Sequence, residues 1–310
     1  MIKPLIKKIV RQVFEDDLDE LRILTAQNLI QFQRNITLKT LSQAEFKVFS
    51  QWGEDGIIQY LIGRLPVETK VFIEFGVENY KEANTRFLLM NDNWSGLVID
   101  ASEKNVNAIK KSNLYWKYDL TAKNIFITRD NIDGIIDEYI EKNELNKEIG
   151  LLSIDVDGVD YYLWEAIESI EPVIVICEYN WIFGNRVPVT VPYKENFNRT
   201  RQHYSNLYFG ASIGALYRLA KTKGYEYIGC TSAGNDAFFV KRKYAEKYLN
   251  PLITSPQKVF NEQKAKESRN RKGKLTFVRG KKRFKLIESQ EVLNLENNEI
   301  IKLKDLISDK

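Results

Sequence analysis

The chain has 310 residues, of which 44% are hydrophobic and 28% are charged, and it carries a net charge of +4. This composition is typical of an ordinary globular protein with one medium-sized domain and additions. No stretch approaches the roughly 20 apolar residues that a membrane span needs, and residues 1–10 are too short and too charged for a signal peptide, so we expect a cytoplasmic location.

Residues 1–45 are expected to form an N-terminal helical segment with one or two amphipathic helices. Apolar residues recur at helical spacing, with charges between them: Ile2, Leu5, Ile6, Ile9, Val13, Leu18, Leu21 and Leu24. This stripe is expected to pack on the main domain or on a second subunit, which would make the protein a homo-oligomer. A basic face of Lys3, Lys7, Lys8 and Arg11 leaves a membrane surface open as the alternative.

Residues 46–242 alternate short apolar strands with helical stretches, which is typical of a parallel sheet covered on both faces. Strands are predicted at residues 71–75, 97–99, 114–118, 151–154 and 173–177. The clearest helices are predicted at residues 130–143, 161–169 and 211–223. Residues 225–229 and 237–240 flank a turn at Ser232 to Asn235 and are predicted to form an antiparallel pair. Cys177 and Cys230 lie in apolar runs, so we expect both to be buried and reduced.

Residues 243–310 form a basic accessory region. Residues 258–285 carry 12 basic and 2 acidic side chains, which could attract phosphates, nucleic acid or an anionic membrane. We expect a solvated connector rather than a specific nucleic-acid site. Short strands are predicted at residues 275–278, 283–287 and 300–303.

Acidic residues accompany the ends of all five predicted parallel strands. Ligands of open α/β sheets bind outside the carboxyl ends of the strands, where the strand order reverses. One acid lies in the first strand, and one follows each of the next four: Glu74, Asp100, Asp119, Asp155 and Glu178. Any single acid at a loop start is more often structural, but five together indicate a site at this edge.

A single glycine, Gly76, follows the first strand. A dinucleotide needs a fuller G-x-G-x-x-G turn to hold its pyrophosphate at a helix N-terminus. S-adenosylmethionine (SAM) has no phosphate, and one glycine suffices for its methionine and ribose part. Asp100, 26 residues after Glu74, could accept hydrogen bonds from both ribose hydroxyls, although the same acid would serve NAD.

Four motifs resemble FkbM-type SAM-dependent methyltransferases of bacterial capsule and lipopolysaccharide clusters. They are FSQWGEDGI at residues 49–57, FIEFGV at 72–77, LLSIDVDG at 151–158 and YFGAS at 208–212. The resemblance covers about residues 48–242. It implies an α/β, Rossmann-like class I methyltransferase sheet of seven strands with the last strand antiparallel. It also implies that Gln51 and Asp55 help to close over SAM, although residues 50–56 could instead be a helix start capped by Ser50.

A second resemblance concerns the catalytic end of the pocket. Macrocin-type sugar O-methyltransferases, which use magnesium, have a matching Ile-Asp-x-Asp run. This resemblance implies that Asp155 and Glu178 hold Mg²⁺ and that Asp157 is the base that takes the hydroxyl proton. The chain departs from that family at Tyr179, where the family has a second acid, and Asn180 is the substitute ligand we consider. Hard oxygen ligands suit Mg²⁺.

His203, the single histidine of the chain, is the competing base, because its ordinary pKa near 6.5 suits proton uptake at neutral pH. It lies in an insertion rich in aromatic residues and arginines, which could form an acceptor site or a structural lid.

The sequence therefore predicts an O-methyltransferase acting on a small sugar or nucleotide-linked sugar. A nicotinamide oxidoreductase is disfavoured by the missing glycines, and a nucleic-acid methyltransferase by the lack of an Asn-Pro-Pro-Tyr type of loop. A SAM-fold binding protein without activity is disfavoured by the catalytic acids.

Overall fold

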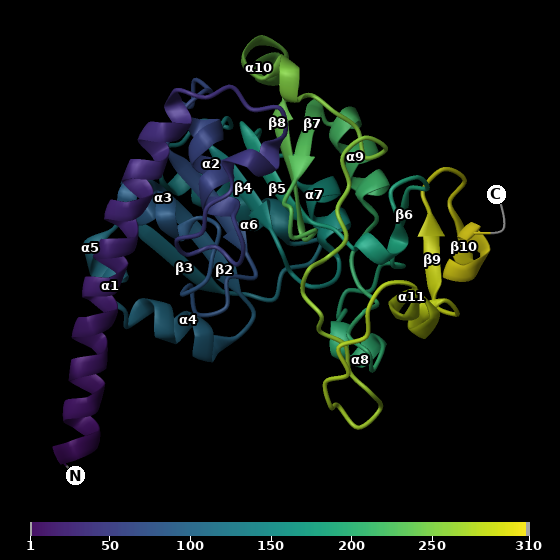
Figure 1. The fold of residues 1–310 in the computed structure, drawn as a ribbon, viewed down its shortest axis with the longest axis horizontal. Helices are drawn as coiled ribbons and strands as arrows, with labels where there is room; N and C mark the ends of the chain where they lie inside the picture. The colour runs from purple at the N-terminus through teal and green to yellow at the C-terminus, as the bar shows by residue number, and fades with distance from the viewer. Residues whose placement is uncertain (1, 308–310) are drawn as a thin grey trace.

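A seven-stranded sheet lies at the centre of the computed structural model, which describes residues 2–307 and the side chains of residues 17–306 (Figure 1). The strand order is β3-β2-β1-β4-β5-β8-β7. The strands are β1 (Val71–Phe75), β2 (Ser95–Asp100), β3 (Leu120–Asn124), β4 (Leu151–Ile154), β5 (Ile174–Glu178), β7 (Tyr225–Cys230) and β8 (Asp236–Lys241). Only β8 runs against its neighbours. The predicted class I sheet with an antiparallel last strand is confirmed.

Helices cover both faces of the sheet because successive strand residues point to opposite sides. In β1, Ile73 and Phe75 pack into the core on one face, while Phe72 packs into the core on the other. The first face is covered by α6 (Ile132–Lys142), α7 (Asp160–Ala166) and α9 (Ile213–Thr222). The second face is covered by α2 (Glu54–Ile62), α3 (Arg86–Asn91), α4 (Glu103–Lys110) and α10 (Arg242–Tyr248).

The N-terminal segment is one long helix, α1 (Ile2–Arg34), followed by a short 3₁₀ turn, η1 (Leu41–Ala44). Figure 1 shows α1 running along the edge of the domain and projecting beyond it. Ala26 is buried, and Ile23 and Ile30 pack beside it. Of the predicted stripe, Leu18, Leu21 and Leu24 are exposed, so they do not pack on the domain. The side chains of the earlier stripe residues and of the basic face, up to residue 16, lie outside the described part of the chain.

Two predicted strands are helices. Residues 114–117 of the first fall in α5 (Asn113–Lys117), which buries none of its side chains, and the strand β3 begins only at Leu120. Residues 283–287 fall in α11 (Lys281–Ile287), where Arg283 and Ile287 are four residues apart and both buried on one helical face. In α11 the helical spacing places these two residues on one buried face, which the local strand pattern did not reveal.

The basic accessory region packs on the insertion after β5. Its strands β9 (Glu291–Asn294) and β10 (Glu299–Lys302) form a small antiparallel sheet with β6 (Val189–Thr190) of that insertion. Leu275 makes one isolated bridge to Arg269, so the predicted strand at residues 275–278 is absent. The rest of the insertion holds the short helices η2 (Trp181–Phe183) and α8 (Arg199–Gln202), and η3 (Asn250–Leu252) and η4 (Leu303–Ile307) complete the chain.

Cys177 in β5 and Cys230 in β7 are both buried and unpaired. No helix within the described residues is long and apolar enough to cross a bilayer.

Candidate active site

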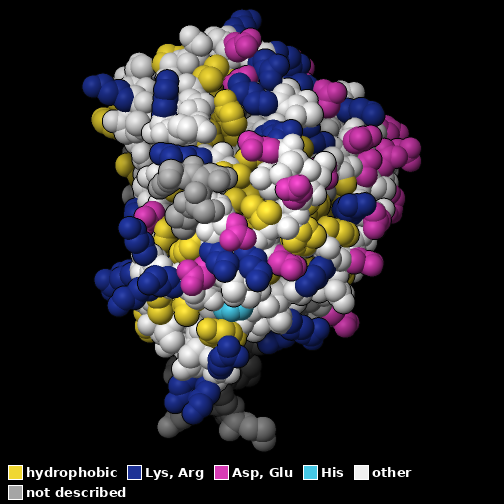
Figure 2. Space-filling view, turned by 90° about the vertical axis from the view of Figure 1, so that its right-hand side faces the viewer, with side chains coloured by type: hydrophobic (Ala, Val, Ile, Leu, Met, Phe, Trp, Pro, Cys, Tyr) yellow, Lys and Arg dark blue, Asp and Glu magenta, His cyan; other side chains and the backbone are white. Residues whose placement is uncertain are grey.

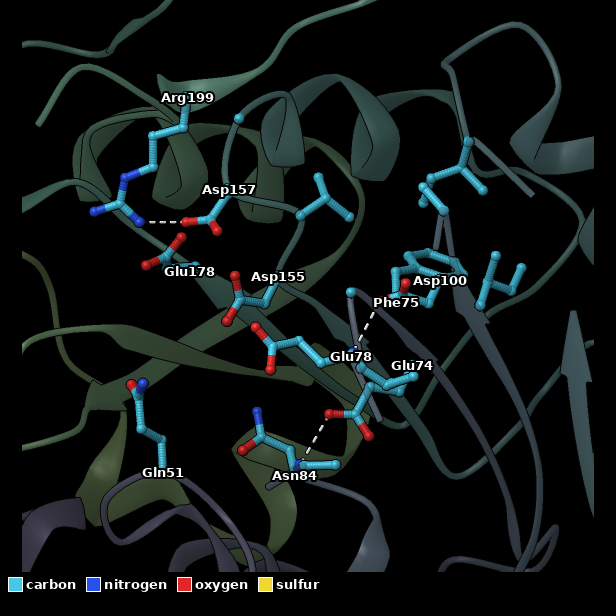
Figure 3. Close-up of a pocket in the computed structure, with 18 of the residues that line it drawn as sticks. Gln51, Glu74, Phe75, Glu78, Asn84, Asp100, Asp155, Asp157, Glu178 and Arg199 are labelled. Carbon is cyan, nitrogen blue, oxygen red and sulfur yellow. Dashed lines mark hydrogen bonds and ion pairs between the residues drawn. The ribbon is translucent and has the colours of Figure 1, made fainter. Parts of the chain in front are cut away.

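A cavity of about 550 Å³ opens where the parallel strands end (Figure 3). Strands β1, β2, β4 and β5 run in the same direction, so their carboxyl ends meet at one edge of the sheet. The wall of the cavity consists of the turn after β1, the end of β2, the loop after β4 and the end of β5. This is the edge at which the sequence predicts a ligand.

Gly76 makes the tight turn after β1. Its φ of +75° lies in the left-handed region, and a Cβ atom there would come within 1.6 Å of the Asp155 carbonyl oxygen. Only glycine therefore fits this position. Asp100 at the end of β2 accepts hydrogen bonds from the backbone N–H of Glu78 and of Ser102, both at 2.8 Å. The Asp100 carboxylate thus fastens the turn after β1 to the end of β2.

Glu74 is buried beneath the same wall, and its carboxylate holds the loop that follows. One oxygen accepts a hydrogen bond from the Asn84 N–H at 2.8 Å, and the other accepts bonds from the N–H and the hydroxyl of Thr85. Burial raises the pKa of Glu74 to about 7. All of these bonds go to protein groups, so Glu74 shapes the cavity wall.

Three carboxylates form a cluster on the wall of the cavity (Figure 3). Oxygen atoms of Asp155, Asp157 and Glu178 all lie within 4.8 Å of one another. Burial raises the pKa of both Asp155 and Glu178 well above the ordinary range, and repulsion from neighbouring acids adds to the effect. Asp155 lines the cavity and is exposed there.

Glu178 has an unused hydrogen-bonding capacity. The residue is 7% exposed, and its Oε2 atom has no hydrogen-bond partner within the described structure. Buried polar atoms nearly always have partners, so an orphan of this kind calls for an explanation such as a ligand or an ion. In Figure 3 the Glu178 carboxylate lies beside those of Asp155 and Asp157.

Arg199 is the one cationic side chain that lines the cavity among the described residues, against nine acidic ones. Its guanidinium donates to the Asp157 carboxylate and to the Asn206 carbonyl oxygen, and it lies 3.8 Å from the centre of the Phe209 ring. Arg199 is contributed by α8 of the insertion after β5. Sequence reasoning noted arginines in this insertion but did not single out Arg199.

Sequence reasoning missed a second carboxyl pair. Asp236 begins β8 directly opposite Glu178 and lines the cavity. Burial, together with the nearby Glu54 carboxylate, raises its pKa well above the ordinary range. The amide nitrogen of Asn235 donates to both carboxylates, at 3.0 and 3.1 Å. The antiparallel direction of β8 was the available signal, because it brings the first residue of that strand to the cavity edge.

A strap from the accessory region closes one side of the cavity. Gln263, Ala265 and Glu267 line it. The buried Arg283 donates to the carbonyl oxygens of Ala265 and Glu267, at 3.0 and 2.9 Å, and so fixes the strap. No pattern of spacing in the sequence could have indicated this contact.

Seven of the predicted site residues line the cavity: Gln51, Glu74, Gly76, Asp100, Asp155, Asp157 and Glu178. Asp55 does not. Its carboxylate accepts bonds from the N–H groups of Val48, Phe49 and Ser50 at 2.7 to 2.8 Å, which organises the loop before α2. Ser50 does not cap that helix either, because Gly53 is the N-cap residue.

Asp119, Asn180 and His203 are also absent from the cavity wall. Asp119 precedes β3, so it lies at the amino end of that strand, at the opposite edge of the sheet. Asn180 is buried, and its side chain is used by bonds to the backbone of Ile182 and of residues 207 and 209. His203 bonds through Nδ1 to the Ser205 hydroxyl at 2.7 Å. None of the three is in position for the role predicted for it.

Comparisons with known proteins give distant structural similarities. No protein-family model matches the chain, and no curated protein sequence matches it. The N-terminal domain of EvdMO1 with SAH bound has a TM-score of 0.40 at 10% identity, covering 63% of this chain and 82% of that one. A SAM-dependent methyltransferase from Clostridium acetobutylicum has a TM-score of 0.36 at 8% identity, covering 60% and 89%. An O-methyltransferase from Bacillus cereus in complex with SAH has a TM-score of 0.33 at 14% identity, covering 55% and 72%. The strand order of this chain is itself that of the class I SAM-dependent methyltransferase fold.

Proposed function

We propose that this protein is a SAM-dependent O-methyltransferase whose acceptor is a hydroxyl of a sugar or a nucleotide-linked sugar. The observation that carries the proposal is the carboxylate cluster of Asp155, Asp157 and Glu178, which adjoins the wall formed by Gly76 and Asp100. One cavity thus joins a wall suited to SAM with groups that can take up a proton.

SAM fits the wall formed by β1 and β2. The Gly76 turn would hold its amino-acid end, and Asp100 would accept hydrogen bonds from its ribose hydroxyls. The apolar residues Ile125 to Ile127, which line the cavity after β3, suit the flat face of adenine. The acidic lining also suits the positive sulfonium.

The turn after β1 argues against a dinucleotide. The next helix, α3, begins at Arg86, ten residues after Gly76. No helix N-terminus therefore directly follows the glycine turn, as a pyrophosphate site of the nicotinamide type requires. This supports SAM over NAD.

The acceptor hydroxyl approaches the carboxylate cluster. Asp157 takes the hydroxyl proton as the acceptor oxygen attacks the methyl carbon of SAM. The carbon–sulfur bond breaks as the new oxygen–carbon bond forms, and S-adenosylhomocysteine leaves with the electron pair. Arg199 orients Asp157 through their hydrogen bond. Carboxylates that face a cavity also bond well to sugar hydroxyls, and Phe197 on the wall offers a ring face for a sugar to stack on.

The cluster also fits Mg²⁺. Three carboxylates offer hard oxygen ligands within 4.8 Å of one another, and the orphan Oε2 of Glu178 supplies a free one. Asp155 and Glu178 would hold the ion, with Asp157 beside it. Bound Mg²⁺ supplies a charge that acidifies a neighbouring hydroxyl. Asn180 is not part of this ligand set, because its amide bonds to the backbone.

Calorimetry with S-adenosylhomocysteine and with NADH tests the cofactor. We expect S-adenosylhomocysteine to bind and NADH to bind far more weakly, and tighter binding of NADH would overturn the assignment. Mass spectrometry of products from a panel of nucleotide-linked sugars tests the reaction. A sugar carrying one added methyl group would support the proposal. The resemblance of four motifs to FkbM-type enzymes suggests that this sugar belongs to surface-polysaccharide assembly. Methyl transfer to nucleic acid instead would refute it.

A further inference from the structure

Residues 268–282, which we name the basic hairpin, form a defined projection next to the cavity strap. Its two arms are joined by a bond from the Thr276 N–H to the Ser268 carbonyl oxygen and by a bond from the Asn270 N–H to the Lys274 carbonyl oxygen, at 2.8 and 2.9 Å. The side chain of Asn270 accepts two further backbone bonds that fix the turn. In Figure 1 the hairpin is the yellow-green loop that projects below α8.

The hairpin is anchored to the insertion at its base. The N–H of Arg269 donates to the Ser205 carbonyl oxygen at 3.2 Å, and the Arg271 guanidinium lies 4.9 Å from the centre of the Tyr204 ring. Ser268 is fully buried. These contacts hold the projection in a fixed direction, so its surface is a stable feature of the fold.

The surface of the hairpin combines positive charge with exposed apolar groups. No acidic residue occurs in it. Its exposed basic side chains are Arg271, Lys272, Lys274, Arg279, Lys281 and Lys282. Leu275 and Phe277 lie among them, with 49% and 56% of their surfaces exposed. Figure 2 shows Lys and Arg side chains beside hydrophobic ones along the lower part of this side of the molecule.

The backbone of Phe277 is strained. Its φ is +51°, a left-handed conformation that bulky side chains rarely adopt. Tyr80, another aromatic residue with positive φ, is buried and bonds to Thr85. Phe277 stays exposed, so the fold gains no comparable burial from it. Backbone strain that no intramolecular packing offsets is typical of a residue that contacts a binding partner.

We propose that the basic hairpin docks this protein on an anionic lipid bilayer. The six cations would contact the phosphates of the headgroups, while Leu275 and Phe277 enter the interfacial layer. Such a surface needs both signals, because neither a few charges nor two apolar side chains hold a protein on a membrane alone. An aliphatic side chain such as Leu275 cannot stack on bases, which favours lipid over single-stranded nucleic acid.

Docking would bring the candidate active site to the bilayer. The hairpin continues directly from Glu267 of the cavity strap, so this wall of the cavity adjoins the docked surface. The inference does not depend on the proposed reaction, since it rests on the hairpin alone.

Sedimentation with lipid vesicles tests the proposal. We expect binding to vesicles of phosphatidylcholine mixed with phosphatidylglycerol, no binding to phosphatidylcholine alone, and weaker binding as salt rises. The variant Arg271→Glu, Lys272→Glu, Lys274→Glu should lose at least about 100-fold in affinity, at roughly fivefold for each cation removed. Phe277→Ser should lose about tenfold while keeping the same salt dependence.

A matched control changes the net charge equally elsewhere. The control variant carries Lys110→Glu, Lys142→Glu and Lys247→Glu. These lysines are exposed on α4, α6 and α10, so the variant should retain vesicle binding. Equal loss in the control and the hairpin variant would show that only net charge matters. Three results would each overturn the proposal. The first is no binding to anionic vesicles at low salt, and the second is wild-type binding by either hairpin variant. The third is a competition experiment in which duplex DNA or RNA displaces the protein from vesicles at a lower concentration than phosphatidylglycerol does.

Discussion

The guanidinium of Arg199 donates a hydrogen bond to the carboxylate of Asp157, 42 residues earlier in the chain. The pair connects the insertion after β5 to the loop after β4. Asp157 belongs to the carboxylate cluster that lines the cavity. Asp157 has a φ of +56°, a conformation that Asp tolerates better than most residues. The backbone turn and Arg199 together fix the direction of this carboxylate.

Asp157→Asn should lower turnover by about 10² to 10⁴, the usual contribution of general acid–base catalysis. The substitution removes the proposed base with little change in volume. Affinity for S-adenosylhomocysteine should stay near the wild-type value, which calorimetry would check. His203→Ala is the matched control, because His203 does not line the cavity and its loss should leave turnover nearly unchanged. Near-normal turnover in Asp157→Asn would show that the base lies elsewhere.

EDTA should abolish turnover and leave affinity for S-adenosylhomocysteine intact, because the cluster would hold the ion on the acceptor side of the cavity. Glu178→Gln should have the same effect, since it removes the charge beside Asp155 and keeps the shape. Restored turnover on adding Mg²⁺ to the EDTA-treated enzyme would complete the test. Full activity in EDTA would mean that these carboxylates act only as hydrogen-bond acceptors for the sugar.

Asp100→Ala should weaken the binding of S-adenosylhomocysteine by about 1.5 to 3 kcal/mol, the scale of a lost charge-assisted hydrogen bond. Part of the lost affinity would arise because the N–H groups of Glu78 and Ser102 lose the hydrogen bonds that they donate to Asp100. Asp119→Ala is the control, because Asp119 lies at the other edge of the sheet. Equal affinities of the two variants would refute the ribose assignment.

Gly76→Ala should lower the free energy of unfolding by about 2 to 5 kcal/mol, because overpacking against the Asp155 carbonyl adds to the strain of a positive φ. Gly134→Ala in α6 is the control, since an added Cβ there meets no atom within 4 Å. That change should be neutral or stabilising by up to about 1 kcal/mol. Urea unfolding of both variants measures the difference, and similar stabilities would contradict the packing at Gly76.

Glu74 should make the fold less stable as pH rises. Burial raises its pKa from 4.5 to about 7, so the folded state holds the proton more tightly than the unfolded chain. The stabilisation is complete below about pH 4.5, declines as pH rises to about 7, and then stays lost, a change of up to about 3 kcal/mol. Glu74→Gln should show a flatter dependence than wild type in urea unfolding between these pH values. Parallel curves would mean that Glu74 does not titrate in this range.

The sequence by itself determined most strands of the sheet and most of one cavity wall. The largely apolar runs at residues 71–75 and 151–154 are strands because a strand buried on both faces is mostly apolar. The acids after such strands then meet at one edge through chain direction alone, which is why Asp100, Asp155 and Glu178 line the same cavity.

Tertiary structure decided the other walls. Residues 114–118 have an aromatic pattern typical of strands. The strand β3 nevertheless begins at Leu120, because Leu120 and Ala122 pair with β2. Asp119 therefore lies at the amino end of β3, at the edge of the sheet opposite the cavity. Arg199 and the strap around Ala265 reach the cavity from separate segments of the chain. Their positions follow from long-range packing, such as the bonds of Arg283 to the strap, and neither periodicity nor spacing encodes such contacts.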